Sequence, residues 1–337
     1  MFISGKKLWL GAAALAAIAG IVACGGSSQP SAASPSSNAS APSSANQSAA
    51  PKPTEVAPPA DQTGGFDGTK AYEHVAKLVS FGPRPPASEG IHRSQEYVIS
   101  QLKSFGCEID QDDFHASTPK GDVQMKNIIA KAPGTGQGII LLLTHYDTLS
   151  SVENFVGAED SASSTGLMIE MARQLCGKKE PNSVWIAFLD GEEAFVNWNQ
   201  DNDHTYGSRE LAARMALSGD LKRVKAVILA DMIGQYNLSI PRQSDSPKWL
   251  TDTVWKTAAR LGYKDIFVSQ ETQTSDDHDP FLERGVPALD IIDLNDYISA
   301  GYWHTPQDTL DKVSPRSVAI VGHVILESVD ELQKKFH

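Results

Sequence analysis

Four continuous apolar runs constrain the fold of this chain more than any other feature. They occupy residues 139–144, 184–189, 224–230 and 286–292. Strands buried on both faces of a parallel sheet have this composition, whereas strands with one face in water alternate apolar and polar residues. Helical patterns lie between the runs. The chain is therefore predicted to form a doubly wound α/β sheet flanked by helices.

Weaker patterns complete this sheet and its helical layers. Strand-like runs at 107–115 and 123–132 are close enough to form a hairpin, which would make the sheet mixed. A first helical pattern ends at Val79, before the turn at 82–86. Further helices are predicted at 88–105, 162–176, 206–217, 247–261 and 315–335.

The first 65 residues differ in composition from the rest of the chain. Residues 1–23 contain two lysines and then a weakly apolar run, which is typical of a signal peptide, although a short membrane anchor is the alternative. The end of this run, Ile-Val-Ala-Cys, resembles the lipobox of bacterial lipoproteins. That resemblance implies acylation of Cys24 and an exported, membrane-anchored lipoprotein, periplasmic or on the cell surface. Residues 24–65, rich in Ser, Ala and Pro, are predicted to be a disordered tether before a folded domain at 66–337.

The net charge of the chain excludes one class of partner. At −12 over 337 residues, with no basic stripe, the chain is expected to bind no nucleic acid. Cys107 and Cys176 have no metal-ligand spacing between them. Each is either a buried apolar residue or one half of a disulfide.

Carboxylates and a histidine follow the predicted strands at the points where these end. His145, the pair Glu192 and Glu193, and Asp231 each come after one of the apolar runs, and Asp290 lies within the last run. In open α/β sheets ligands bind beyond the carboxyl ends of the strands. These side chains are therefore expected to converge.

The adjacent glutamates can do different chemistry. One can coordinate a metal while the other moves protons for a group that the metal polarises, although such pairs also suit solvated helix starts. Asp160, Glu193 and His304 would give zinc three protein ligands and leave one position open. Taken singly, Asp160 could cap a helix and His304 could be a loop histidine.

Five segments resemble the zinc aminopeptidase superfamily in order and spacing: 145–147, 157–162, 190–193, 277–281 and 304–306. Two of them extend into segments similar to the animal-type glutaminyl-peptide cyclotransferases, or glutaminyl cyclases. One runs through Trp198 to Arg209, and the other runs from Asp276 to Trp303 and His304. The similarity covers the region from Phe66 to the C-terminus.

The resemblance implies a zinc aminopeptidase-like fold and an enzyme that converts the N-terminal glutamine of peptides to pyroglutamate with release of ammonia. It also implies one zinc ion per chain and a role for each matching residue. The implied zinc ligands are Asp160, Glu193 and His304, the implied catalytic residues are Glu192, Asp231 and Asp276, and the implied pocket walls are Trp198 and Trp303. Core packing is the alternative for the tryptophans.

Two other functions fit the same residues. An aminopeptidase with two metal ions would use His145 and Asp231 at the second site, with Asp160 as the bridging ligand. A metal-free binding module on the same fold is a third hypothesis, against which the complete set of ligands argues. The segment that carries Trp198 favours the cyclase.

Asp290 departs from the animal cyclases, which generally have histidine there. If the fold brings Asp290 near Asp276, two carboxyl groups are expected to share one proton through a short hydrogen bond. The segment at 295–302 is also longer than the animal loop.

Overall fold

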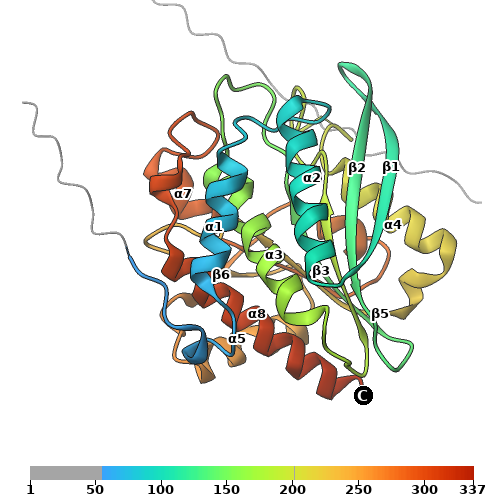
Figure 1. The fold of residues 1–337 in the computed structure, drawn as a ribbon, viewed down its shortest axis with the longest axis vertical. Helices are drawn as coiled ribbons and strands as arrows, with labels where there is room; N and C mark the ends of the chain where they lie inside the picture. The colour runs from blue at the N-terminus through green and yellow to red at the C-terminus, as the bar shows by residue number, and fades with distance from the viewer. Residues whose placement is uncertain (1–54, 201) are drawn as a thin grey trace, which may run out of the picture. The chain divides into compact units, whose positions relative to one another are not determined.

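The computed structural model describes residues 55–200 and 202–337 and is built around one six-stranded sheet (Figure 1). The strands follow the order β1-β2-β4-β3-β5-β8. Their bounds are β1 Glu108–Thr118, β2 Gly121–Ala132, β3 Ile139–His145, β4 Ser183–Leu189, β5 Val224–Asp231 and β8 Ala288–Ile292. The last four in spatial order are parallel, and β2 joins them through antiparallel pairs with β1 and β4. The predicted mixed, doubly wound sheet is confirmed.

Helices cover both faces of this sheet. Along β3, Ile140 and Leu142 join a core formed with α1, α2, α3, α5 and α8, whereas Leu141 and Leu143 join a second core with α4 and α6. Because neighbouring side chains of a strand point to opposite faces, one apolar run supplies both cores. The helices are α1 Gly68–Val79, α2 Glu89–Ser104, α3 Ser164–Leu175, α4 Tyr206–Ser218, α5 Lys248–Arg260, α6 Asp279–Leu282, α7 Leu294–Ala300 and α8 Pro315–Lys335.

Polar side chains fix the starts of three helices. Asp67, Ser88 and Ser314 precede α1, α2 and α8, and each accepts a hydrogen bond from a backbone N–H in the first turn. These caps satisfy donors that have no partner within the helix. They explain why the predicted starts of α2 and α8 agree closely with the observed ones.

Packed structure begins before Phe66. A short 3-10 helix spans Ala60–Gln62, and the Ser314 hydroxyl donates a hydrogen bond of 2.6 Å to the Glu55 carboxylate. Cys24 and the predicted signal peptide lie outside the described residues, so the lipid anchor stays a prediction. Across residues 55–200 and 202–337, no helix combines the length and apolar character needed to cross a membrane.

The strands and helices that the sequence did not predict are short, and α6 is one of them. Strands β6 (Ile240–Gln243) and β7 (Phe267–Thr272) form a separate parallel pair, and α7 occupies the segment that was expected to be a long loop. Both strands are short, and β7 is largely exposed. They therefore lack the continuous apolar pattern of the main sheet.

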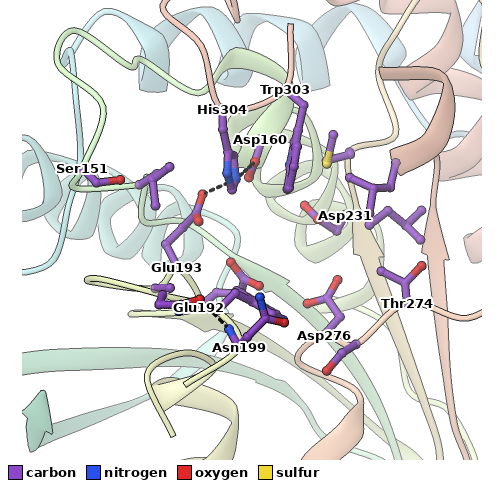
Figure 2. A pocket seen from close by; sticks show the side chains of 18 of the residues that line it. Ser151, Asp160, Glu192, Glu193, Asn199, Asp231, Thr274, Asp276, Trp303 and His304 are labelled. Atoms are coloured by element: carbon purple, nitrogen blue, oxygen red, sulfur yellow. Dashed lines mark hydrogen bonds and ion pairs between the residues drawn. The ribbon is translucent and has the colours of Figure 1, made fainter. Parts of the chain in front are cut away.

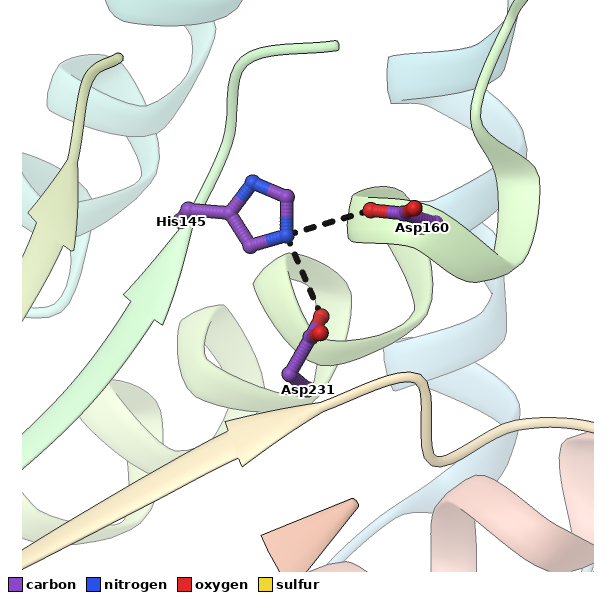
Figure 3. Close-up of side chains that lie close together, drawn as sticks. All are labelled: His145, Asp160 and Asp231. Carbon is purple, nitrogen blue, oxygen red and sulfur yellow. Dashed lines mark hydrogen bonds and ion pairs between the residues drawn. The ribbon is translucent and has the colours of Figure 1, made fainter. Parts of the chain in front are cut away.

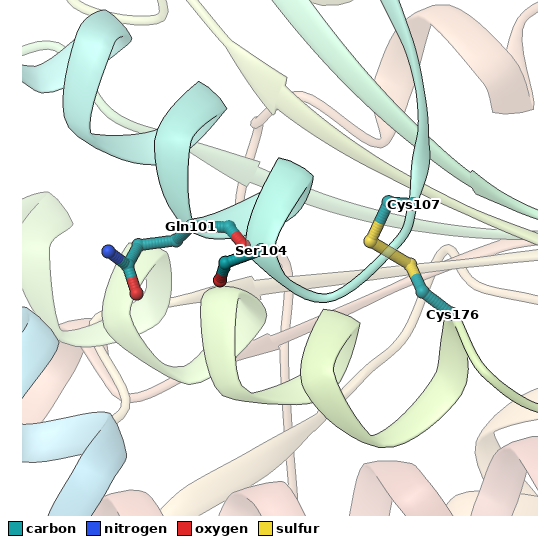
Figure 4. Close-up of a disulfide and its surroundings, with 4 residues drawn as sticks. All are labelled: Gln101, Ser104, Cys107 and Cys176. Atoms are coloured by element: carbon teal, nitrogen blue, oxygen red, sulfur yellow. Dashed lines mark hydrogen bonds between the residues drawn. A yellow bond between two sulfur atoms is a disulfide. The ribbon is translucent and has the colours of Figure 1, made fainter.

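A disulfide joins Cys107 and Cys176, which resolves the two alternatives for these residues (Figure 4). It links the segment before β1 to the end of α3, across a sequence separation of 69 residues. The bond ties the antiparallel edge of the sheet to a helix that packs on its centre.

Loss of this disulfide should lower the free energy of unfolding by about 4 kcal/mol, because the open chain has more unfolded conformations. Urea unfolding of the wild type and of the double variant Cys107→Ser/Cys176→Ser, each with and without reductant, measures this. The wild type should lose stability in reductant and the double variant should not. Equal midpoints for the wild type in both conditions would contradict the expected contribution.

Candidate active site

The carboxyl ends of the parallel strands bring the predicted residues together. His145 ends β3 and Asp231 ends β5, while Glu192 and Glu193 lie in the loop after β4. Asp160 precedes α3, close to the end of β3. All five side chains are buried. The expected convergence at one edge of the sheet is present.

Asp160, Glu193 and His304 form the first group of possible metal ligands. Nε2 of His304 lies 3.3 Å from Oδ2 of Asp160 and 3.4 Å from Oε1 of Glu193 (Figure 2). Within the described part of the chain, Oε1 of Glu193 is buried and has no hydrogen-bond partner. Zinc holds nitrogen and oxygen ligands at about 2.0–2.2 Å, so donor atoms at these separations can surround one ion. The donor set fits zinc.

His145, Asp160 and Asp231 form a second group (Figure 3). Nε2 of His145 lies 3.2 Å from Oδ1 of Asp160 and 3.1 Å from Oδ1 of Asp231. These are the residues that a two-metal aminopeptidase would use for its second ion. The ligand geometry is therefore compatible with either reaction.

Two aspartates hold the loops that carry Glu192, Glu193 and Asp160. The sequence analysis assigned no specific function to either aspartate. Asp147 accepts hydrogen bonds from the backbone N–H groups of Glu192 and Glu193, at 3.1 and 3.3 Å. Asp308 accepts hydrogen bonds from the N–H groups of Glu159 and Asp160, at 2.8 and 3.1 Å. The sequence feature that could have identified Asp147 is its place two residues after His145. No feature of the sequence identifies Asp308, because its partners lie about 150 residues away in the chain.

Arg84 fixes the loop between β3 and Asp160. Its buried guanidinium donates hydrogen bonds to the carbonyl oxygens of Tyr146, Val156 and Gly157, at 3.2, 2.6 and 3.0 Å. Burial lowers the pKa of Arg84 to about 10, so the side chain stays charged at neutral pH. In the sequence this residue belonged only to a predicted turn.

The buried charges shift the pKa values of the site strongly. Burial raises the pKa of Glu192 well above its usual value, opposed by His145 and reinforced by Asp276 and Glu193. Burial also raises the pKa of Glu193 to about 7. For His304, burial is outweighed by Glu193 and Asp160, which raise the pKa to about 10. A metal ion bound by Glu193 and His304 would compete with protons for the same ligand atoms.

A pocket of about 550 Å³ opens over the first ligand group. Trp198 lines this pocket. Trp303, Glu192, Asp231 and Asp276 line it as well (Figure 2). The ring of Trp303 stacks on His304 with 4.0 Å between centroids, and that of Trp198 stacks on His204 with 4.1 Å. Each tryptophan thus has one face held by a histidine.

Asp290 lies buried in β8, and its contacts differ from those expected. Its Oδ2 accepts a hydrogen bond of 3.4 Å from Gln243, and among the described residues its Oδ1 has no partner. The short bridge to Asp276 is therefore absent. The physical reason is that Gln243, on the unpredicted strand β6, reaches Asp290, while Asp276 accepts the N–H of Asp277 at 2.6 Å. Burial raises the pKa of Asp290 well above its usual value, with Asp276 and Asp231 adding to the shift.

Comparison with known proteins identifies the family. The sequence model of Peptidase family M28 matches residues 127–329, and the chain belongs to this family. The chain is 30% identical to a glutaminyl-peptide cyclotransferase of Drosophila melanogaster over 258 residues, which cover 67% of this chain and 72% of that protein.

Two solved structures show similarity of both sequence and fold. The first is the glutaminyl cyclase of an Acidobacteriales bacterium, with a TM-score of 0.76 and 38% identity over 80% of this chain and 96% of that chain. The second is a Zn-dependent exopeptidase from Parabacteroides distasonis, with a TM-score of 0.71 and 26% identity over 78% and 97%. The resemblance to the zinc aminopeptidase superfamily and to its cyclase branch is confirmed.

The raised pKa of Asp290 predicts how stability depends on pH. The folded state holds the Asp290 proton more tightly than the unfolded state does, so the wild type loses this contribution as the pH rises above the usual aspartate range of about 4. Asp290→Asn cannot lose that proton. The variant should therefore become progressively more stable than the wild type between about pH 5 and about pH 8.

Urea unfolding of both proteins across this range gives the difference in unfolding free energy at each pH. Asp265→Asn, at an exposed position, is the matched control and should show a constant difference. A constant difference for Asp290→Asn as well would mean that Asp290 is ionised in the folded protein.

Proposed function

We propose that this protein is a zinc-dependent glutaminyl-peptide cyclotransferase, which converts the N-terminal glutamine of peptides to pyroglutamate and releases ammonia. The observation that carries the proposal is the shared pocket of Glu192, the ligand group with His304, and two tryptophan walls. The similar cyclases from an insect and a bacterium support it.

Asp160, Glu193 and His304 would hold the zinc ion. A zinc ion bound there supplies Lewis acidity to a carbonyl oxygen of the substrate. We infer one zinc per chain, because the nucleophile of this reaction is the substrate's own amine and no second ion is needed to activate water. His145, Asp160 and Asp231 would then act as a hydrogen-bonded group beside the site.

Glu192 would move the proton. The α-amine of the substrate attacks the carbon of its own side-chain amide, which closes a five-membered lactam. Glu192 accepts a proton from the attacking nitrogen and returns it to the leaving nitrogen, which departs as ammonia. Its carboxylate is held in place because Asp147 binds its backbone N–H and His145 lies 3.9 Å from its Oε2.

Trp198, Trp303 and Asp276 would orient the substrate. The tryptophans supply apolar walls that exclude water and restrict the glutamine side chain, and intramolecular attack gains from such enforced orientation. Asp276, buried on the pocket wall, would accept a hydrogen bond from the substrate's amine. Every residue to which the resemblance gave a role thus has a function in the proposed reaction or beside its site.

A two-metal aminopeptidase is the second candidate. The specific observation in its favour is that the ligating atoms of His145, Asp160 and Asp231 lie within 4.8 Å of one another. The similarity of the chain to the Zn-dependent exopeptidase from Parabacteroides distasonis supports this second candidate. The identity of the chain to the bacterial cyclase, at 38% against 26%, favours cyclisation.

The two reactions give different products from one peptide. Incubated with a Gln-leading peptide, the protein should produce the same peptide minus ammonia, and it should leave Leu- and Ala-leading peptides intact. Mass spectrometry of the mixture distinguishes cyclisation from removal of the first residue. Shortened peptides without any ammonia-loss product would make aminopeptidase the better assignment.

Changes at the two glutamates should separate chemistry from metal binding. Glu192→Gln should lower kcat by about 10²–10⁴-fold, because the amide keeps the shape and loses the proton acceptor, while zinc stays bound. Glu193→Ala removes a ligand and should lose zinc. Metal analysis after gel filtration, beside the rate of ammonia release, measures both. Full activity in Glu192→Gln would refute its role.

We also propose that the protein is exported and anchored by a lipid at Cys24. The disulfide between Cys107 and Cys176 supports export, because such bonds persist in oxidising compartments. Cys24→Ser should release the protein from the membrane fraction of its host. Unchanged partitioning of this variant would indicate that the apolar segment itself is the anchor.

A further inference from the structure

A third group of metal-ligating side chains lies outside the site described above. Asp245, His278 and Asp279 have ligating atoms within 4.8 Å of one another. Nε2 of His278 lies 3.9 Å from Oδ1 of Asp245 and 3.6 Å from Oδ1 of Asp279. Neither separation is short enough for a hydrogen bond. The proposed reaction gives none of these three residues a role.

His278 is the residue that distinguishes this group from an ordinary acidic surface. The side chain is completely buried, and over the described ranges of the chain neither ring nitrogen has a hydrogen-bond partner. Burying a polar group without a partner costs free energy. Nε2 is nevertheless directed towards two carboxylates, and these are partly exposed, at 23% for Asp245 and 31% for Asp279. Solvent therefore reaches the open side of the group.

We propose that Asp245, His278 and Asp279 bind a divalent transition-metal cation, Zn²⁺ or Mn²⁺, at a second site distinct from the catalytic one. Imidazole suits zinc, and carboxylates suit both ions, with water completing the coordination shell from the exposed side. The separations are slightly longer than the 3.3 and 3.4 Å of the catalytic ligands. Asp245 lies in a loop, and a small movement of it would shorten its distance to Nε2 of His278, now 3.9 Å, to that of the catalytic ligands.

This site should bind its cation with lower affinity than the catalytic site binds zinc. Metal-bound histidines usually donate their other ring N–H to an acceptor, and loss of such a partner typically costs about 10–100-fold in affinity. Nδ1 of His278 has no acceptor among the described residues. The second cation should therefore bind only after the catalytic ligands are filled.

The cation would join the loop after β6 to the segment that forms one wall of the catalytic pocket. Asp245 follows β6, and His278 precedes α6. The segments are already linked, because the N–H of Ser244 donates to the carbonyl of Thr272 and the N–H of Thr274 donates to Gln243. Residues 273–276, which include Asp276, line the pocket. A bound cation would stabilise this wall.

Titration of the zinc-loaded protein with Mn²⁺ tests the proposal, with binding followed by calorimetry and the bound ion by electron paramagnetic resonance. We expect one Mn²⁺ to bind per chain, a higher melting temperature, and coupling of the bound ion to an imidazole nitrogen. Asp245→Asn and Asp279→Asn should each weaken this binding by about tenfold or more. Asp265→Asn, an exposed control, should leave it unchanged.

The proposal would be overturned by no binding to the zinc-loaded protein, by binding without nitrogen coupling, or by binding that survives both Asp245→Asn and Asp279→Asn. The second outcome would indicate adventitious attachment to surface carboxylates, and the third would indicate the group with His145. Ca²⁺, which prefers oxygen ligands, should bind more weakly than Mn²⁺. Equal binding of the two ions would exclude a histidine ligand. The melting temperature of each variant without Mn²⁺ confirms that it is folded.

Discussion

Repulsion among buried carboxylates at the carboxyl edge of the sheet is the constraint on which the whole site depends. Asp160, Glu192, Glu193, Asp231 and Asp276 are all buried around one pocket. An unpaired charge buried in a protein costs several kcal/mol, so such a cluster needs cations or shared protons. His145 and His304 lie next to these carboxylates and offset part of the repulsion, and a metal ion would offset the rest. Burial, reinforced by the neighbouring Asp276 and Glu193, raises the pKa of Glu192, which suits a residue that must accept and return a proton.

The fold holds these groups together through contacts made outside the pocket. Arg84 binds the carbonyl groups of the loop that leads to Asp160, and Asp308 accepts the N–H of Asp160 itself. Asp147 fixes the backbone of the two glutamates by accepting their N–H groups. Asp160 and Glu193 therefore each lie on a backbone segment that a charged side chain holds in place. Such supporting contacts are what keep a metal site in its productive geometry.

The main sheet and the convergence of His145, Glu193 and Asp231 could be predicted because both follow from local patterns in the sequence. The roles of Asp160 and His304 as zinc ligands came instead from the resemblance of their segments to the zinc aminopeptidase superfamily. A continuous apolar run predicts a buried strand, and its end predicts where a side chain such as His145 must lie. The partners of Arg84 and Asp308 could not be predicted, since they come from distant parts of the chain that only the tertiary fold brings close. The bridge expected between Asp290 and Asp276 failed for the same reason, because Gln243 lies on a strand too short to recognise.

The residues at this edge of the sheet are proposed to hold a single zinc ion beside Glu192. Crystals of the protein prepared with one molar equivalent of zinc, measured on both sides of the zinc absorption edge, test this proposal directly. We predict one anomalous peak per chain, between Asp160, Glu193 and His304. A peak of comparable height between His145, Asp160 and Asp231 would contradict the claim and would make the two-metal aminopeptidase the better account.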